Sequence, residues 1–260
     1  MSAPKIAVTD EPLPSGALLT RIKLNAPERC NSLDPQMVEE LRDALGHARR
    51  QDAAFVALTA KGRHFSTGGD VAAFHASRDR AAYADTVVGP LQDIVRTMLQ
   101  LPAIVVAGVQ GACTGGSAGL LFASDLALLA ENAFIQPFYT EVGFAPDGGW
   151  CALLPERIGA ARALHIQLEN RRLTAPMAVE LGIAQETVPA AELERCLGDK
   201  IRRLDETGIL HSMRATKRLV WDEPRIAAVS ERLRAEQDSF RSLIGREETA
   251  AGMERFLDTL

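Results

Sequence analysis

The sequence lacks clustered cysteines and histidines, which argues against a zinc-binding module or a disulfide-stabilised fold. Its four cysteines are far apart and form no C-x-x-C pair: Cys30, Cys113, Cys151 and Cys196. Its five histidines show no spacing typical of metal ligands. The simplest interpretation is a cytoplasmic protein with reduced, mostly buried thiols, and we expect no bound metal.

The chain also lacks an apolar segment long enough to cross a membrane, and it lacks concentrated positive charge. The N-terminal stretch MSAPKIAVTDEPLP does not contain the apolar core of a signal peptide. The formal net charge is −5, and the arginines are scattered along the chain. We therefore expect neither a membrane partner nor a nucleic-acid partner, although single arginines remain available to a phosphorylated ligand.

With 260 residues, 47% of them apolar and 24% charged, the chain can bury the core of one large domain. Strand and helix patterns alternate through its first half, and from Trp150 onward the pattern is almost entirely helical. In order, the predicted elements are a hairpin of KIAVTD and ALLTRIKLN, a strand over 53–60, a helix over 81–100, strands over 103–109, 125–130 and 133–136, and a long loop over FYTEVGFAPDGG.

The first helix has the clearest start signal in the sequence. Asp34 is a favourable N-cap residue, and Pro35 suits the first helical position. The apolar residues that follow repeat at helical spacing and predict one buried face. They are Met37, Val38, Leu41, Ala44, Leu45 and Ala48.

The alternation of strands and helices predicts an α/β core over residues 1–200. A helical C-terminal segment over residues 201–260 follows it. This segment is amphipathic and too thin to form a core of its own. We expect it to pack on the core or on a neighbouring subunit, where it would serve oligomerisation and closure of the pocket.

A glycine-rich stretch at residues 111–125, GACTGGSAGLLFASD, has two incompatible interpretations. Five of its residues, GGSAG, fit G-x-S-x-G, which would make Ser117 the nucleophile of a serine hydrolase. That motif places its serine directly at the end of a strand, yet the preceding predicted strand ends near Val109. The downstream histidines, His165 and His211, lie in amphipathic helical patterns that are more typical of surface or packing positions. The pattern therefore disfavours the hydrolase.

The other interpretation is a glycine turn that opens a helix and holds an oxyanion with free backbone N–H groups. A second turn of this kind, FSTGGD at residues 65–70, also follows a strand and precedes a helix. Together the two turns can direct two N–H groups at one carbonyl oxygen, as the enolate of a thioester requires. The alternative is that both are only tight turns and helix caps, with Asp70 capping the next helix.

A series of motifs occurs in order along nearly the whole chain. They are APERCNSLDPQMVEELRDAL, GRHFSTGGDV, AGVQGACTGGSAGLLFASDLALLAENAFI, VGFAPDGGWCALLPERIGAARAL and LTAPMAVELGIAQETV. In these motifs the sequence resembles the enoyl-CoA hydratase/isomerase (crotonase) superfamily, including the F-S-x-G-x-D and G-x-x-P-D-x-G segments of that superfamily.

The resemblance implies a crotonase-like spiral of ββα repeats with a helical C-terminal region, assembled as a homotrimer or a dimer of trimers. It implies an acyl-CoA substrate, a place in fatty acid metabolism, and no cofactor apart from the CoA of the substrate. The backbone N–H groups of Gly69 and Gly116 would form the oxyanion hole. Arg29 would contact a phosphate or the adenine, or else lie in solvent. The residues implied in binding the substrate are Glu28, Arg29, Cys30, Thr67, Gly68 and Gly115.

The sequence differs from the pattern of the family's hydratases at the two positions where they carry glutamates. One position is Gly119 and the other falls near Phe138 and Tyr139, none of which is acidic. Asp147, in PDGG, matches the position where several isomerases of the family carry their acid and dehalogenating relatives carry a nucleophile. We predict that Asp147 is the acid and base, with Glu141 as second choice. The other role open to Asp147 is a helix N-cap.

One carboxylate beside a polarised thioester is sufficient to move a proton between two carbons. Burial among Phe138, Phe144 and Trp150 would raise the pKa of Asp147 toward the working range. We therefore predict an enoyl-CoA isomerase that shifts a double bond through an enolate. The alternatives are a 2-enoyl-CoA hydratase that uses Glu141 or Asp147, a pseudo-enzyme that binds acyl-CoA without turnover, and a serine hydrolase.

Overall fold

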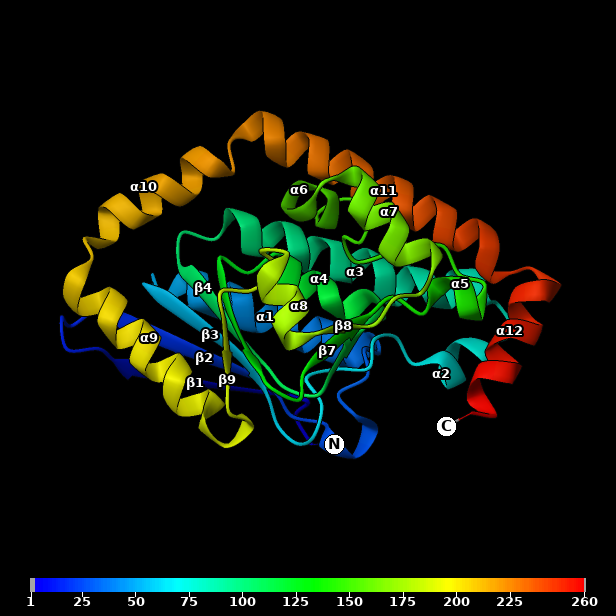
Figure 1. Ribbon diagram of the computed structural model, residues 1–260, viewed down its shortest axis with the longest axis horizontal. Coiled ribbons are helices and arrows are strands. Elements are labelled where there is room, and N and C mark those ends of the chain that lie inside the picture. Colours follow the sequence, from blue (N-terminus) through cyan, green and yellow to red (C-terminus); the bar gives the residue numbers. More distant parts are fainter. Residues whose placement is uncertain (1–2, 260) are drawn as a thin grey trace.

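Two β-sheets organise the fold, and helices cover them (Figure 1). The computed structural model describes residues 3–259. The larger sheet has six strands in the order β1-β2-β3-β4-β6-β9, and the smaller has three in the order β5-β7-β8. The strands are β1 (Ile6–Pro12), β2 (Leu18–Leu24), β3 (Phe55–Ala60), β4 (Ile104–Val109), β5 (Ala112–Thr114), β6 (Leu126–Ala130), β7 (Phe134–Gln136), β8 (Leu173–Thr174) and β9 (Glu186–Val188).

The helices follow the predicted pattern over most of the chain. They are α1 (Pro35–Arg50), α2 (Val71–Ala76), α3 (Arg80–Gln100), α4 (Ala118–Phe122), α5 (Tyr139–Val142), α6 (Leu154–Ile158), α7 (Ala160–Leu168), α8 (Ala175–Glu180), α9 (Leu193–Thr207), α10 (Leu210–Val220), α11 (Glu223–Ile244) and α12 (Glu247–Leu257), with short 3-10 helices at Pro27–Arg29, Gly115–Ser117 and Ala190–Glu192. Within residues 3–259, no helix is long and apolar enough to cross a membrane.

The start of α1 confirms its sequence signal. Pro35 is the first residue of the helix, and the carboxylate of Asp34 accepts a hydrogen bond from the N–H of Met37 at 2.9 Å. All of the predicted apolar positions of α1 are buried. The predicted hairpin is also confirmed, because β1 and β2 pair antiparallel along their whole length.

The chain crosses from one sheet to the other in successive turns. In chain order, β4 of the larger sheet is followed by β5 of the smaller, and β6 is followed by β7. Ser66, which follows β3, makes the equivalent step through a parallel bridge to Cys113. Strands β2, β3, β4, β6 and β9 run parallel, so the segments that leave their carboxyl ends gather at one edge of the sheet. This arrangement confirms the α/β fold class and brings the two glycine turns to that edge.

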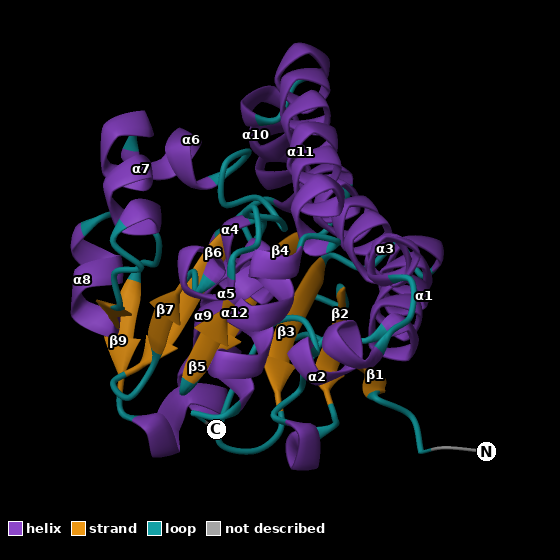
Figure 2. Cartoon of the chain, turned by 90° about the vertical axis from the view of Figure 1, so that its right-hand side faces the viewer, coloured by secondary structure: helices purple, strands orange, loops and turns teal. Residues whose placement is uncertain are grey.

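Helices cover both faces of the larger sheet, so its central strands are buried. Every residue of β3 and of β4 is buried, which explains their continuous apolar sequences. On one face lie α1 and α3, and α11 runs alongside α3 (Figure 2). On the other face, Leu193, Leu197 and Ile201 of α9 meet apolar side chains of β3, β4 and β6.

The C-terminal helices pack on the core of their own chain. The predicted division at residue 200 falls inside α9. Lys217 of α10 is buried, and its Nζ donates to the carbonyl of Ala103 at 2.9 Å and to the carboxylate of Asp125 at 2.7 Å. Beyond α11, α12 turns back and packs against α2 and α5 (Figure 1). The chain end therefore reaches the region that the two glycine turns occupy.

Four short elements were not predicted as they occur. α5 is a helix of four residues in the region predicted to be a long loop. β5 separates the glycine turn from β4, and β8 and β9 interrupt a region predicted to be helical. Each of these strands has only two or three residues, which is too short for a period of two to develop in the sequence.

Candidate active site

The two glycine turns lie directly against each other. The N–H of Ser66 donates to the carbonyl of Ala112 at 3.0 Å, and the N–H of Thr114 donates to the carbonyl of Ser66 at 3.2 Å. A Cβ added to Gly68 would lie only 2.7 Å from the carbonyl oxygen of Thr114. Gly68 also has a φ of 81°, so glycine is required there by both its conformation and its surroundings. The turns therefore form one structural unit.

Gly69 and Gly116, one in each glycine turn, each have a backbone N–H group that is free to bind a ligand. Within the described part of the chain, neither N–H donates a hydrogen bond to another residue. The N–H of Gly116 belongs to the first turn of a short helix, where such groups have no partner within the helix. Both residues line the same cavity. Two unpaired donors at one cavity are what stabilisation of a developing oxyanion requires.

Ser117 is not arranged as a nucleophile. It is fully buried, and its hydroxyl donates to the carbonyls of Thr114 at 2.7 Å and Ser66 at 3.2 Å. His165 and His211 are exposed and do not line the cavity. A catalytic serine needs access to the substrate and a basic partner within hydrogen-bond reach. The G-x-S-x-G interpretation is therefore wrong, and the Ser117 hydroxyl instead holds the two turns together.

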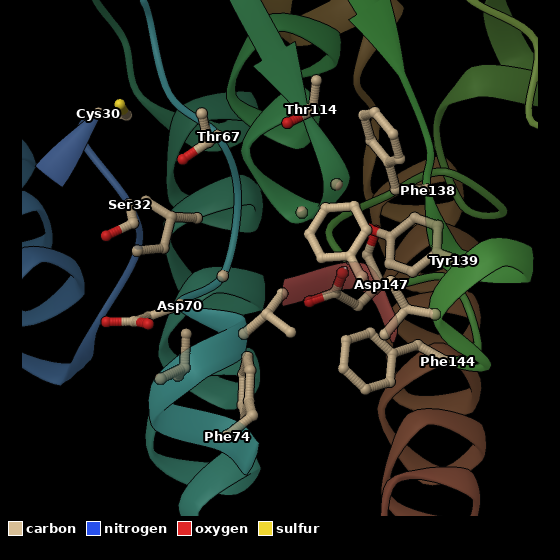
Figure 3. A pocket seen from close by; sticks show the side chains of 18 of the residues that line it. Cys30, Ser32, Thr67, Asp70, Phe74, Thr114, Phe138, Tyr139, Phe144 and Asp147 are labelled. Carbon is tan, nitrogen blue, oxygen red and sulfur yellow. Dashed lines mark hydrogen bonds between the residues drawn. The ribbon is translucent and has the colours of Figure 1, made fainter. Parts of the chain in front are cut away.

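Asp147 lies in the loop after α5, and its carboxyl group returns to the second glycine turn (Figure 3). The residue is 6% exposed, and the hydroxyl of Tyr139 donates to its Oδ1 at 2.5 Å. A Cβ added to Gly116 would lie 2.9 and 3.0 Å from the two carboxyl oxygens, so the carboxyl group lies directly over this residue. Burial raises the pKa of Asp147 to about 6, while the Tyr139 hydrogen bond acts in the opposite direction. The predicted rise of this pKa is confirmed.

The alternative role for Asp147, a helix N-cap, is wrong. Turns follow Asp147, and the next helix, α6, begins only at Leu154. The burial of Tyr139 raises the pKa of its hydroxyl well above the ordinary value, and the neighbouring carboxylate of Asp147 adds to this. Tyr139 therefore keeps its proton and acts as a hydrogen-bond donor that fixes the orientation of the Asp147 carboxyl group.

Backbone atoms fill the place where a hydratase of this type would carry its first glutamate. A Cβ added to Gly119 would lie 1.7 Å from the carbonyl oxygen of Gly148, closer than any side chain can come. Gly148 is equally restricted, because it has a φ of 66° and its Cβ would lie 2.4 Å from the carbonyl oxygen of Gly116. The loop that carries Asp147 thus packs backbone against backbone on the second glycine turn. Position 119 cannot hold a glutamate unless that loop moves.

The cavity above these groups has a volume of about 580 Å³ and a largely aromatic wall. The rings of Phe74, Phe144 and Phe240 pack together with centroids 4.9 to 6.0 Å apart. A second pair, Phe138 and Phe256, has centroids 5.5 Å apart. Figure 3 shows the carboxyl group of Asp147 among several of these rings. A volume of this size is typical of a small-molecule site, and its wall suits an apolar group.

Most residues predicted to bind the substrate line this cavity. Glu28 is exposed and does not line it, and the carbonyl of Gly68 is occupied by the N–H of Leu33. The predicted residues that the structure places in the wall are Arg29, Cys30, Thr67, Gly69, Gly115, Gly116 and Asp147.

Three other charged residues near the site, Arg29, Asp70 and Glu141, have partners within the protein. The guanidinium of Arg29 forms an ion pair with Asp70 at the edge of the cavity. Asp70 also accepts a hydrogen bond from the N–H of Ala73, which confirms its predicted role as the cap of α2. Glu141 is exposed, accepts a hydrogen bond from Asn170 at 2.7 Å and lies outside the cavity wall. Asp147 is thus the buried carboxyl group of the cavity.

Several residues of the cavity carried no recognisable signal in the sequence. Tyr139 stands near the place expected for the second glutamate and supplies a hydroxyl instead. His64 accepts a hydrogen bond at Nδ1 from the N–H of Ala112, and burial lowers its pKa, so it serves as a neutral acceptor. Phe240 and Phe256 come from α11 and α12. Their positions in amphipathic patterns predicted packing but not the site on which they pack.

The chain is similar to known proteins in sequence and in fold. A family model described as enoyl-CoA hydratase/isomerase matches residues 15–260. The chain is 32% identical over 212 residues to the trans-2-decenoyl-(acyl-carrier-protein) isomerase of Streptococcus mutans, covering 77% of each chain. It is 33% identical over 180 residues to a Rhodobacter capsulatus protein named probable enoyl-CoA hydratase, covering 68% of this chain and 67% of that one. A solved enoyl-CoA hydratase from Mycobacterium avium subsp. paratuberculosis superposes with a TM-score of 0.85 at 27% identity, covering 99% and 97% of the two chains.

Proposed function

Because the chain belongs to the enoyl-CoA hydratase/isomerase family, we propose that it shifts a carbon–carbon double bond in a CoA thioester, with Asp147 as the acid and base. The observation that carries this proposal is one buried carboxyl group over the glycine turns, with no space for a glutamate at position 119. Asp70, the other carboxylate of the cavity wall, is occupied as a helix cap and as the partner of Arg29.

The reaction needs one proton acceptor and two oxyanion donors. The thioester oxygen accepts hydrogen bonds from the N–H groups of Gly69 and Gly116, which makes the protons at C2 more acidic. The carboxylate of Asp147 takes a proton from C2 of a 3-enoyl thioester, and the C3–C4 pair of electrons is delocalised into a dienolate. The carboxyl group of Asp147, whose proton can exchange with solvent, then delivers a proton to C4, which completes the 2-enoyl product and regenerates the carboxylate.

The aromatic wall supports an apolar acyl group as the part of the substrate inside the protein. Burial of a chain or ring against Phe74, Phe144 and Phe240 removes apolar surface from water without leaving a polar group unpaired. The name of the Streptococcus mutans relative, an isomerase of a decenoyl thioester, is consistent with such a group. The homotrimer or dimer of trimers, the place in fatty acid metabolism and the absence of a cofactor remain predictions from the resemblance, and the cytoplasmic location remains a prediction from the cysteine pattern.

We expect that in D₂O a 3-enoyl-CoA is converted to the 2-enoyl isomer, with deuterium at the exchanging carbons. Little 3-hydroxyacyl-CoA should form in the same period, because one carboxylate moves protons but does not hold and activate a nucleophilic water as a pair does. Mass spectrometry and NMR of a panel of 3-enoyl-CoAs with apolar chains and rings provide the measurement. The comparison is internal to each reaction, so it does not depend on the natural chain length.

Two results would replace this proposal with another one. Rapid formation of 3-hydroxyacyl-CoA from 2-enoyl-CoA would identify a hydratase that uses Asp147 without the usual partner. Absence of turnover across the panel, together with thermal stabilisation by acyl-CoA, would identify a binding protein rather than an enzyme.

The pH dependence of turnover should report the ionisation of Asp147. Its carboxylate is the form that accepts a proton, and this form is present above the pKa of about 6. Turnover should therefore be independent of pH above that value and fall as the pH decreases through it. Values of kcat/KM measured from about pH 5 to 8 test this expectation, because their pH dependence reports the ionisation of the free enzyme. A profile that stays flat through pH 6 would exclude Asp147 as the base.

A further inference from the structure

A second buried carboxyl group, that of Glu236, belongs to α11 and lies behind the loop of Asp147. Glu236 is only 4% exposed. Its Oε2 accepts a hydrogen bond from the N–H of Gly149 at 2.8 Å. Its Oε1 accepts from the N–H groups of Cys151 at 2.6 Å and Ala152 at 2.8 Å. Three backbone donors therefore converge on this one side chain.

These hydrogen bonds stabilise both the Glu236 carboxyl group and the backbone N–H groups that it accepts from. A buried carboxylate is very unfavourable unless hydrogen bonds or a cation compensate for the lost water, and in residues 3–259 no ion pair is formed by Glu236. Residues 149–152 form turns rather than a helix or strand, so their N–H groups need partners outside regular structure. Glu236 supplies those partners from a helix far along the sequence.

The loop held in this way is the one that places Asp147. Gly149 follows Asp147 by two residues, and Gly148 and Gly149 both have positive φ, at 66° and 103°. Glycines impose little conformational preference of their own, so the course of this loop depends on its contacts. Glu236 fixes it from one side, and the indole N–H of Trp150 fixes it from the other by donating to the carbonyl of Gly115 at 2.7 Å.

The same helix also contributes to the cavity wall. Phe240 lies four residues after Glu236, and residues four apart share one face of a helix. On the neighbouring helix α3, the side chain of Gln92 donates to the carbonyl of Leu233 of α11. One surface of α11 thus meets both the acyl pocket and the backbone behind the acid.

We propose that Glu236 is a positioning residue, whose carboxyl group holds the backbone of residues 149–152 and thereby keeps Asp147 over the oxyanion donors. The inference rests on the proposed role of Asp147. It assigns to the C-terminal segment a part in catalysis beyond closing the pocket. Glu236 itself does not reach the cavity wall, so it acts through the loop and not on the substrate.

The titratable groups that interact with Glu236 are Asp147 and Cys151 of the loop and Tyr139 of α5. Burial raises the pKa of Glu236 to about 8 against the effect of its three N–H donors, and the nearby Asp147 contributes to the rise. Gln167 of α7 is a neutral amide that donates to the carbonyl of Trp150 in the same loop, and Gln92 of α3 is one that donates to the carbonyl of Leu233 in α11. The pKa of Asp147 is shifted by its own burial, by Tyr139 and by a backbone hydrogen bond. Glu236 therefore acts on the position of Asp147 and not on its ionisation.

The test is Glu236→Gln. Glutamine keeps the size of the side chain but turns an NH₂ group toward one of the backbone donors, so part of the set of hydrogen bonds is lost. We expect kcat to fall by about 10- to 100-fold while KM changes by less than about threefold, as when a reacting group is misplaced by a fraction of an ångström. Hydrogen exchange of the peptide that contains residues 147–152 should accelerate.

Gln92→Leu is the matched control, because it loosens the contact of α11 with α3 without touching the loop. Its kcat and its hydrogen exchange at residues 147–152 should remain close to wild type. Glu236→Asp keeps the carboxyl group and shortens the side chain, and it should give the same changes if the glutamine variant does not fold. Equal loss of activity in Gln92→Leu and Glu236→Gln, with the same hydrogen exchange at residues 147–152 in both, would reduce Glu236 to a general stabilising residue and overturn the proposal.

Failure of this inference can be distinguished from failure of the proposed reaction. Unchanged hydrogen exchange over residues 147–152 in Glu236→Gln overturns the positioning role, whatever reaction the enzyme performs. Full activity of an Asp147→Asn variant overturns the proposed reaction, whereas the exchange result does not depend on turnover.

Discussion

Replacement of Asp147 by asparagine is expected to lower kcat by about 10²–10⁴-fold, the usual contribution of a positioned acid or base. Asparagine is nearly the same size, and its amide oxygen can still accept the hydrogen bond of Tyr139. The fold and the binding of CoA should therefore change little. The variant cannot accept the proton from C2, so the loss should appear in kcat and not in thioester affinity.

Steady-state kinetics with a 3-enoyl-CoA substrate and a binding measurement with a non-reactive acyl-CoA provide the test. Glu141→Gln is the control, because Glu141 is exposed, bonded to Asn170 and outside the cavity. That variant should retain wild-type turnover. If Asp147→Asn keeps more than about half of the activity, Asp147 is not the acid and base, and a large loss in Glu141→Gln would transfer the role to Glu141.

The elements with strong local signals could be predicted from the sequence. The start of α1 depends on Asp34 and Pro35, which act within one turn of the helix, and both behave as expected. The strands at 53–60 and 103–109 are long apolar runs because helices cover both faces of the larger sheet. A strand that is buried on both faces has a continuous apolar sequence, which can be recognised without knowing which elements pack against it.

Elements defined by distant contacts could not be predicted. β8 and β9 each have only two or three residues, and they are strands because β7 and β6 lie beside them. The one-turn helix α5 begins after Phe138, whose φ is 63°, an unusual conformation for a bulky residue. The N–H of Phe138 is bonded to the side chain of Asn170, a contact that no local pattern reveals.

The candidate site likewise contains some residues that the sequence identifies and others that only the structure reveals. Gly69, Gly116 and Asp147 were identified through motifs, and the structure places all three in one cavity. In the sequence Tyr139 is only a position without an acid, and Glu236 has no distinguishing feature within a long amphipathic helix. Their importance arises from which backbone and carboxyl groups they meet in space. Sequence spacing contains no information about a contact between α11 and a loop more than eighty residues away.

The second large effect is expected when the oxyanion donor at Gly116 is removed. Gly116→Pro eliminates the N–H, and loss of one such donor typically costs about 10²–10³-fold in kcat, or ~3 kcal/mol of transition-state stabilisation. Proline also adds side-chain atoms, and a Cβ at this position would lie 2.9 and 3.0 Å from the carboxyl oxygens of Asp147. A fall in activity for the proline variant alone would therefore combine two causes.

Gly116→Ala separates these causes, because alanine adds the same Cβ beside Asp147 and keeps the N–H. The difference in kcat between the alanine and proline variants then measures the donor, and we expect it to be about 10²-fold or more. Ser117→Ala should be almost silent, since the Ser117 hydroxyl is bonded to backbone carbonyls and is buried away from the cavity. Thermal unfolding and acyl-CoA binding of all three variants establish that the turn is intact. Equal kcat values for Gly116→Ala and Gly116→Pro would mean that the N–H of Gly116 does not stabilise the enolate, and the negative charge would then have to be held by Gly69 and other donors.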